Sequence, residues 1–129
     1  MPRPLAAAAC IATTIFALTA ASAPPRRHAH LVRSEPMADS TVAPPAALRL
    51  WFSEKVDVSV SSVRLRDAGG ATVRTGALAY AGPADAKSPV VASIAGPLKP
   101  GTYRVAWVAA SDDGHAVKGE FAFRVAAAR

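Results

Sequence analysis

Cysteine is almost absent from this chain of 129 residues. The single cysteine, Cys10, lies in an apolar N-terminal run that we expect to be removed. The rest of the chain then has no disulfide, no thiol nucleophile and no thiolate metal ligand. Methionine is also scarce, because Met37 is the only one beyond the N-terminal run. A binding site for a soft ion such as Cu(I) therefore has few ligands to use.

Long hydrophobic runs are absent after residue 23, so nothing there predicts a membrane-spanning helix. Before it, Leu5 to Ala21 is apolar and uncharged, follows Arg3, and leads into the A-x-A pattern Ala21-Ser22-Ala23. This order predicts a secretory signal peptide over residues 1–23 and one mature domain over 24–129. Pro24 disfavours a cut directly before it, so cleavage after Ala21 is an alternative. An uncleaved N-terminal anchor is the other interpretation, although the run is short for one.

The sequence lacks the clustered positive charge that nucleic-acid binding requires. It has 15 Lys and Arg residues against 9 Asp and Glu residues. Apart from Arg26-Arg27, the basic residues are scattered singly along the chain and are not interleaved with aromatic residues. This pattern favours a solvated surface and no nucleic-acid partner.

Recognisable catalytic motifs are missing as well. There is no P-loop, no GxGxxG and no nucleophile elbow. Ser111, Asp113 and His115 invite comparison with a triad, but on one hairpin we expect them to splay apart. The adjacent carboxylates of Asp112 and Asp113 should point to opposite sides, unlike a glycosidase pair. We predict no catalytic residues and no organic cofactor site.

Hydrophobic residues that alternate with polar ones predict short β-strands. The alternation covers Leu48–Phe52, Tyr103–Ala109 and Phe121–Val125. A further extended run is expected over Val58–Leu65, broken near Ser61-Ser62. Hairpin or tight turns are expected at residues 67–70 and 97–101. No window has a helical period, so we predict an all-β, immunoglobulin-like sandwich of about seven strands.

Aromatic residues make up only 6% of the chain and should supply most of the bulk of the core. We expect Trp51, Trp107, Tyr103 and the phenylalanines to fill it. Tyr103 follows a turn, so it is either a tyrosine corner or ordinary core.

Two short clusters hold all three histidines. Asp113 and His115 are two residues apart, as are His28 and His30, so within each pair the side chains share a side on an extended path. Gly114 lets the loop turn between its neighbours. Asp-x-His alone is typical of an exposed polar hairpin. Imidazole and carboxylate together form an N,O ligand set, which suits Cu(II) if the fold joins the two clusters.

Four motifs in order carry a family resemblance, and the similarity runs from His28 to Val125, essentially the whole mature chain. They are His28-Ala-His-Leu-Val-Arg-Ser-Glu-Pro36, Leu50-Trp-Phe-Ser-Glu54, Pro100-Gly-Thr-Tyr-Arg-Val-Ala-Trp107 and Ser111-Asp-Asp-Gly-His-Ala-Val-Lys-Gly-Glu-Phe-Ala-Phe123. The chain resembles the CopC family of periplasmic copper-resistance proteins. The resemblance implies a Greek-key sandwich and an exported protein that carries or buffers Cu(II) without catalysis. It also implies a possible membrane partner, a copper transporter of the CopD type.

The resemblance places Cu(II) ligands at His28, Asp113 and His115, with Glu54 in or near the site and His30 as a candidate. Asp113 is alternatively an orienting partner of an imidazole. The methionine-rich loop of some family members is absent. In the family the first histidine is usually the mature N-terminus and also ligates through its amine.

One departure from the family lies just before His28, where Pro24-Pro-Arg-Arg27 follows the expected cleavage sites. Either a second protease trims after Arg27, or ligation uses side chains alone. Two other classes of function stay open from the sequence. One is a copper monooxygenase with a histidine brace, and the other is a structural immunoglobulin-like module without metal.

Overall fold

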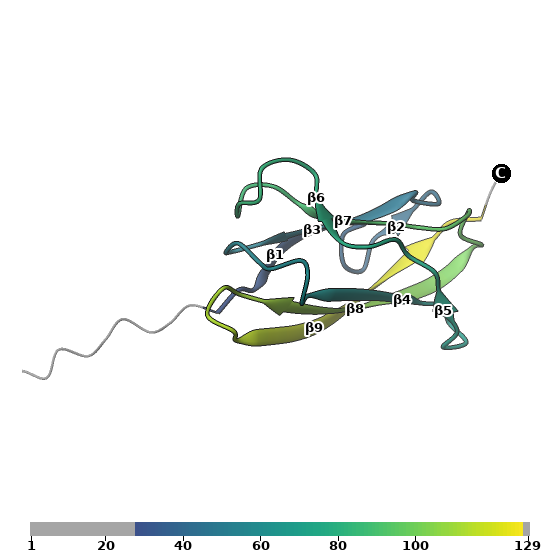
Figure 1. Ribbon diagram of the computed structural model, residues 1–129. Coiled ribbons are helices and arrows are strands. Elements are labelled where there is room, and N and C mark those ends of the chain that lie inside the picture. The colour runs from purple at the N-terminus through teal and green to yellow at the C-terminus, as the bar shows by residue number, and fades with distance from the viewer. Residues whose placement is uncertain (1–27, 128–129) are drawn as a thin grey trace, which may run out of the picture.

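The fold is a sandwich of two β-sheets, given by a computed structural model that describes residues 28–127 (Figure 1). The four-stranded sheet has the order β1-β3-β7-β6, with β1 at Leu31–Glu35, β3 at Ala47–Phe52, β7 at Val90–Ser93 and β6 at Ala79–Tyr80. The five-stranded sheet has the order β2-β9-β8-β4-β5, with β2 at Thr41–Val42, β9 at Ala116–Val125, β8 at Gly101–Ala110, β4 at Ser62–Arg66 and β5 at Thr72–Val73. The all-β sandwich is confirmed.

The chain changes sheets repeatedly, so several strands pair with partners that are distant in sequence. β1 pairs with β3, β3 with β7, and β4 with β8, all antiparallel. The structure has nine strands where about seven were expected, and three of the nine have only two residues each. Within residues 28–127 there is no helix of the length and hydrophobicity that crossing a membrane demands. The predicted signal peptide at 1–23 lies outside the described residues.

The core forms where the inward side chains of both sheets meet. The inward residues of β8 are buried as the alternation predicts, and they are Tyr103, Val105, Trp107 and Ala109. Leu48, Leu50 and Phe52 are buried from the opposite sheet. Full burial of a side chain the size of valine, leucine or phenylalanine contributes about 1.5–3 kcal/mol to stability. Because no cysteine lies between 28 and 127, no disulfide joins the two sheets there, and the packing of these side chains has to hold them together.

Two local arrangements fix the ends of β8. The hydroxyl of Tyr103 donates a hydrogen bond to the carbonyl of Lys99 at 2.7 Å, which confirms a tyrosine corner. Near the other end, Trp107 packs edge-on against Phe52, with ring centroids 5.3 Å apart. Its cross-strand partner is Gly119, where an added Cβ would lie 2.3 Å from the indole ring. Glycine at this position makes room for the tryptophan.

Two expectations from the sequence are wrong in detail. Trp51 does not fill the core, because it faces away from its buried neighbours in β3 and lies under the guanidinium of Arg33 at 4.5 Å. The extended run expected from Val58 begins only at β4. Before β4, the carboxylate of Asp57 accepts hydrogen bonds from the amide and hydroxyl of Ser59, which forms a turn and leaves Val60 exposed.

Candidate metal centre

Three segments meet at one end of the sandwich. They are residues 28–30 before β1, the loop between β3 and β4, and the hairpin between β8 and β9 (Figure 1). His30 and Ser53 bond to each other twice, through Ser53 N to the His30 carbonyl at 2.9 Å and His30 N to Ser53 Oγ at 3.0 Å. The amide of Asp57 donates to the carbonyl of Ala110 at 2.8 Å. These bonds hold all three segments together.

The hairpin of residues 111–115 is closed by its own backbone. The amide of Ser111 donates to the carbonyl of His115 at 3.0 Å, and the amide of Gly114 donates to the carbonyl of Ser111 at 3.0 Å. Gly114 has a φ of +81°, a left-handed conformation that costs any other L-residue about 1–2 kcal/mol. The spacing of Asp113 and His115 therefore depends on the glycine between them.

The carboxylate of Asp113 organises the hairpin. Oδ1 accepts hydrogen bonds from Ser111 Oγ at 2.5 Å and from the His115 amide at 3.0 Å. Oδ2 lies 3.0 Å from His115 Nδ1. The bond from Ser111, followed by those from the ring and amide of His115, holds the pKa of Asp113 well below its ordinary value of 3.8. The carboxylate is therefore an anion at every pH near neutrality.

Ser111, Asp113 and His115 do not splay apart as expected, because the carboxylate of Asp113 bonds to both of the other residues. They still do not form a triad. The hydroxyl of Ser111 donates to the carboxylate and not to the imidazole, so His115 is not placed to activate it. Sequence reasoning assigned Ser111 no role at the candidate metal site. The Ser-x-Asp spacing in a tight loop is the signal that would have found it.

His28 reaches this hairpin from the other end of the described chain. The rings of His28 and His115 are 5.2 Å apart between centroids and lie edge to face at 72°. Between His28 and His30, Ala29 is buried in the core at 2% exposure. Because side chains alternate along an extended segment, this burial directs both histidines outward. The fold thus brings His28 beside the hairpin that carries Asp113 and His115, which is the juxtaposition that the family resemblance implied.

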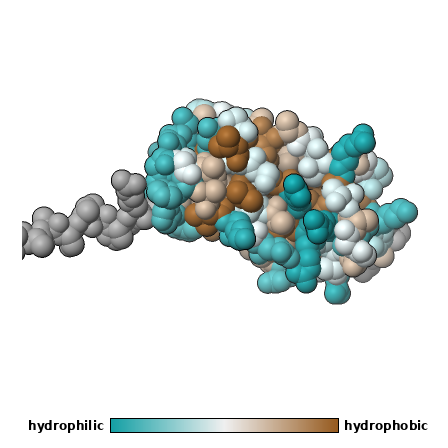
Figure 2. Space-filling model, turned by 60° about the horizontal axis from the view of Figure 1, so that its bottom comes forward, coloured by the Kyte–Doolittle hydropathy of each residue, from teal (hydrophilic) through white to brown (hydrophobic). Residues whose placement is uncertain are grey.

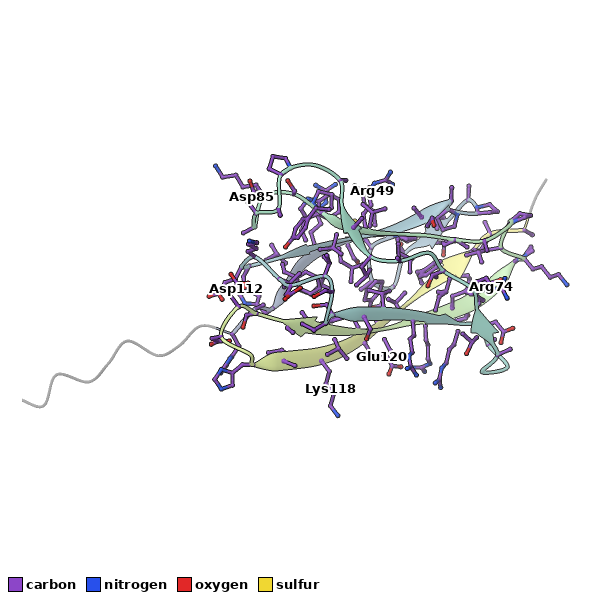
Figure 3. All side chains as sticks on the ribbon, viewed as in Figure 1. Arg49, Arg74, Asp85, Asp112, Lys118 and Glu120 are labelled. Atoms are coloured by element: carbon purple, nitrogen blue, oxygen red, sulfur yellow. The ribbon has the colours of Figure 1, made fainter. Side chains whose placement is uncertain are left out.

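The other candidate residues lie at the same end of the sandwich but are less closely engaged. Glu54 is half-buried and follows Ser53, the residue bonded to His30. His30 and Asp112 are exposed, and Figure 3 shows Asp112 at this end of the sandwich. Between residues 28 and 127, no three His, Cys, Asp or Glu side chains already form a closed cluster for a metal ion. Closing around an ion therefore requires side-chain rotation.

The donor atoms at this end fit a borderline divalent cation. When neutral imidazole donates Nδ1–H to a carboxylate, Nε2 keeps its lone pair for a metal, an arrangement common around metal-binding histidines. Oδ1 of Asp113 already accepts two hydrogen bonds, but Oδ2 has one partner and keeps its second lone-pair direction for a metal. The side chains of His115 and Asp113 are 53% and 40% exposed, so an ion can reach them from solvent.

Comparison with known proteins relates the chain to one family. The model of the CopC domain matches residues 31–126. Copper resistance protein C of Xanthomonas campestris pv. juglandis is 40% identical over 121 residues, which cover 89% of this chain and 94% of that protein.

Two crystal structures have the same fold. PcoC, a methionine-rich copper resistance protein from Escherichia coli, has a TM-score of 0.66 and 37% identity, covering 78% of this chain and 100% of that one. CopC from Methylosinus trichosporium OB3b has a TM-score of 0.68 and 32% identity, covering 79% and 97%. Several of the relatives are named as resistance proteins and none of those compared is named as an enzyme, which agrees with the prediction of a non-enzyme. The chain belongs to the CopC family.

Proposed function

We propose that this protein is exported to the periplasm, where it binds Cu(II) and carries or buffers it for copper resistance. His28, Asp113 and His115 supply the ligands, and Glu54 lies at the edge of the site. The signal for export is the apolar segment within residues 1–23. The acceptor of the metal is a membrane copper transporter of the CopD type.

The observation that carries the proposal is the contact between the rings of His28 and His115. A hairpin with Asp-x-His alone offers one imidazole, and a second from a distant segment turns the pair into a chelating site. Nitrogen and carboxylate ligands favour Cu(II), which also has the highest affinity in the divalent series. The names of the relatives point to the same metal.

The ligands that are missing among the described residues support Cu(II) as the proposed oxidation state. Residues 28–127 contain no cysteine, and their one methionine, Met37, follows β1 at the end opposite to His28. Cu(I) prefers thiolate and thioether ligands, so the imidazole and carboxylate site suits Cu(II). The exposure of His115 suits a carrier, because an open site releases its metal to a partner more readily than a closed one.

The test is a Cu(II) titration followed by electron paramagnetic resonance, on the wild type and on His28→Ala. We expect a single bound Cu(II) with hyperfine coupling to imidazole nitrogen in the wild type, and loss of one nitrogen coupling in the variant. His30→Ala is the matched control, because it removes a histidine two residues away that points outward without a contact to His115. Unchanged nitrogen couplings in His28→Ala would refute the two-histidine site.

The N-terminus needs a separate measurement, because residues 1–27 lie outside the described part of the chain. Intact mass of the exported protein identifies its first residue. If His28 is first, the amine is a further nitrogen ligand; any other first residue rules out trimming after Arg27. The side-chain site predicts nitrogen coupling from His28 in both cases.

A further inference from the structure

The outer face of the five-stranded sheet gathers basic residues that are scattered in the sequence. We call this surface the basic face. Its cations come from three neighbouring strands, and they are Arg64 and Arg66 of β4, Arg104 of β8, and Lys118 and Arg124 of β9. All five are exposed. Figure 2 turns this side of the molecule forward, with hydrophilic side chains projecting from it, and Figure 3 shows Lys118 pointing outward.

The strand register produces the gathering. Arg66 lies directly opposite Arg104 across β4 and β8, on the non-core side of the sheet. Like charges in directly opposed positions destabilise a sheet, so this pair lowers stability unless something neutralises it. Arg64 is two residues from Arg66 on the same side of β4. At least three cations therefore stand within neighbouring positions of one surface.

Little acidic charge balances the basic face. Glu120 is the one acidic residue within its strands, and it accepts a hydrogen bond from Arg104 at 2.8 Å. At the borders, the carboxylate of Asp67 accepts bonds from the amides of Gly69 and Ala71, and Asp39 lines a depression beside Arg124. Among residues 28–127, no ion pair includes Arg64, Arg66 or Lys118.

Two shallow depressions flank the opposed arginines. One of about 360 Å³ is lined by Arg64, Arg66, Arg104 and Glu120. The other, of about 320 Å³, has Arg66, Arg104 and Asp67 in its lining. Guanidinium groups bind phosphate oxygens with two parallel hydrogen bonds. The surface therefore suits several phosphate groups presented side by side.

The composition of the basic face favours a lipid surface over other anionic partners. Tyr103, Trp107 and Phe123 of β8 and β9 are buried, so the face has no aromatic residue on which nucleic-acid bases could stack. It also lacks the aromatic anchors usual at the centre of a protein interface. What remains is a sheet surface with arginines and small apolar side chains, which matches a plane of anionic headgroups.

We infer that the basic face binds the surface of a membrane that contains anionic phospholipid. This goes beyond copper binding and rests on different residues. The hairpin of residues 111–115 leads directly into β9, three residues before Lys118. A protein lying on its basic face therefore holds its metal-binding end beside the membrane surface, where a membrane acceptor would meet it.

The test is flotation with vesicles of phosphatidylcholine, with and without phosphatidylglycerol, using the exported protein as the cell processes it. The wild type should bind only the vesicles with phosphatidylglycerol, and added salt should release it, because salt screens exposed charges. The double variant Arg64→Gln with Arg66→Gln should lower binding about 30-fold, because it removes the attraction of two cations to the anionic surface. Lys118→Gln should lower it about fivefold.

The matched control is Arg49→Gln with Lys87→Gln, which removes the same charge elsewhere; Arg49 lies on the outer face of the other sheet. The binding of this control to the vesicles should stay close to that of the wild type. All variants carry the same N-terminus, so differences in processing do not enter the comparison. Equal losses in the two double variants, or no preference for phosphatidylglycerol, would overturn the inference. Binding to polyglutamate but not to vesicles would point to an acidic protein and would also overturn it. Copper titration of each variant should match the wild type, which separates this test from the proposed copper site.

Discussion

His115 and His28 meet at the candidate site but are held in different ways. His115 is part of a closed hairpin, in which its ring, amide and carbonyl are all hydrogen-bonded. His28 precedes the first strand and is placed by its neighbours: Ala29 is buried in the core, and His30 is bonded to Ser53. No described residue forms a hydrogen bond with the His28 side chain. One half of the site is formed before metal binds, and the other half is only brought near.

This difference indicates how the site closes. A preformed ligand loses little conformational freedom on binding, whereas ordering a free side chain costs about 0.5–1.5 kcal/mol. Copper should therefore gain more net binding energy from His115 and Asp113 than from His28. The hairpin would capture the ion, and the N-terminal segment would complete its coordination.

The largest expected effect is the loss of His115. His115→Ala should weaken Cu(II) binding by more than about 100-fold, beyond the usual cost of losing an outer-shell partner. His28→Ala should weaken it by about 10-fold, because ordering offsets part of its contribution. Competition titrations against a chelator of known affinity measure both. Equal losses would show that the two halves are held alike.

An intermediate effect is expected from Ser111→Ala. This variant keeps every proposed ligand but removes the hydrogen bond from Ser111 to the carboxylate of Asp113. The pKa of Asp113 should rise toward 3.8, because that hydrogen bond is the main cause of its lowering. A carboxyl with a lowered folded pKa stabilises the fold above its unfolded pKa, and this contribution is lost as the pH falls below about 3.8. Copper affinity near neutral pH should fall by up to about 10-fold.

Carboxyl carbon chemical shifts against pH, measured without metal, test this prediction directly. Asp113 should stay ionised below pH 3.8 in the wild type and titrate nearer that value in Ser111→Ala. Identical titration of Asp113 in both proteins would exclude a role for Ser111.

The smallest effect is expected from Glu54→Gln. Glu54 is half-buried at the metal-binding end and has no hydrogen bond to either histidine. A carboxylate that does not ligate the ion acts on it through water, where an opposite charge about 8 Å away contributes about 0.5 kcal/mol, so Cu(II) affinity should fall about twofold. Glu35→Gln, at the end of β1 that is farther from His28, serves as the control for net charge. A loss of Cu(II) affinity of about 10-fold or more would show that Glu54 is a ligand, which would add it to the half of the site formed by Asp113 and His115.

Much of the fold was predictable because its signals are local. Alternating burial along β8 follows from the order of its residues, and Tyr103 could be considered a corner because it follows a turn. The hairpin of residues 111–115 was equally accessible, since a glycine between Asp113 and His115 allows the turn that brings their side chains within 3.0 Å. The family resemblance supplied what spacing alone did not, namely the pairing of His115 with His28.

Other features could not be inferred from neighbouring residues. Trp51 is aromatic but lies on the outer side of β3 against Arg33, because strand alternation overrides its hydrophobicity. Ser111 was considered only as a nucleophile, and its bond to Asp113 depends on the exact path of the hairpin. The basic residues appeared scattered, but Arg66 and Arg104 become neighbours because β4 pairs with β8.

The sequence by itself determined the parts of this protein that depend on a few adjacent residues: its strands, its turns and the Asp113–His115 half of the site. Only the tertiary structure decided which residues, distant in the sequence, lie side by side. His28 reaches His115 because burial of Ala29 and the pairing of β1 with β3 fix residues 28–30 beside the hairpin. The basic face forms because strand register aligns residues from three strands, and register is set by the packing of the whole sheet.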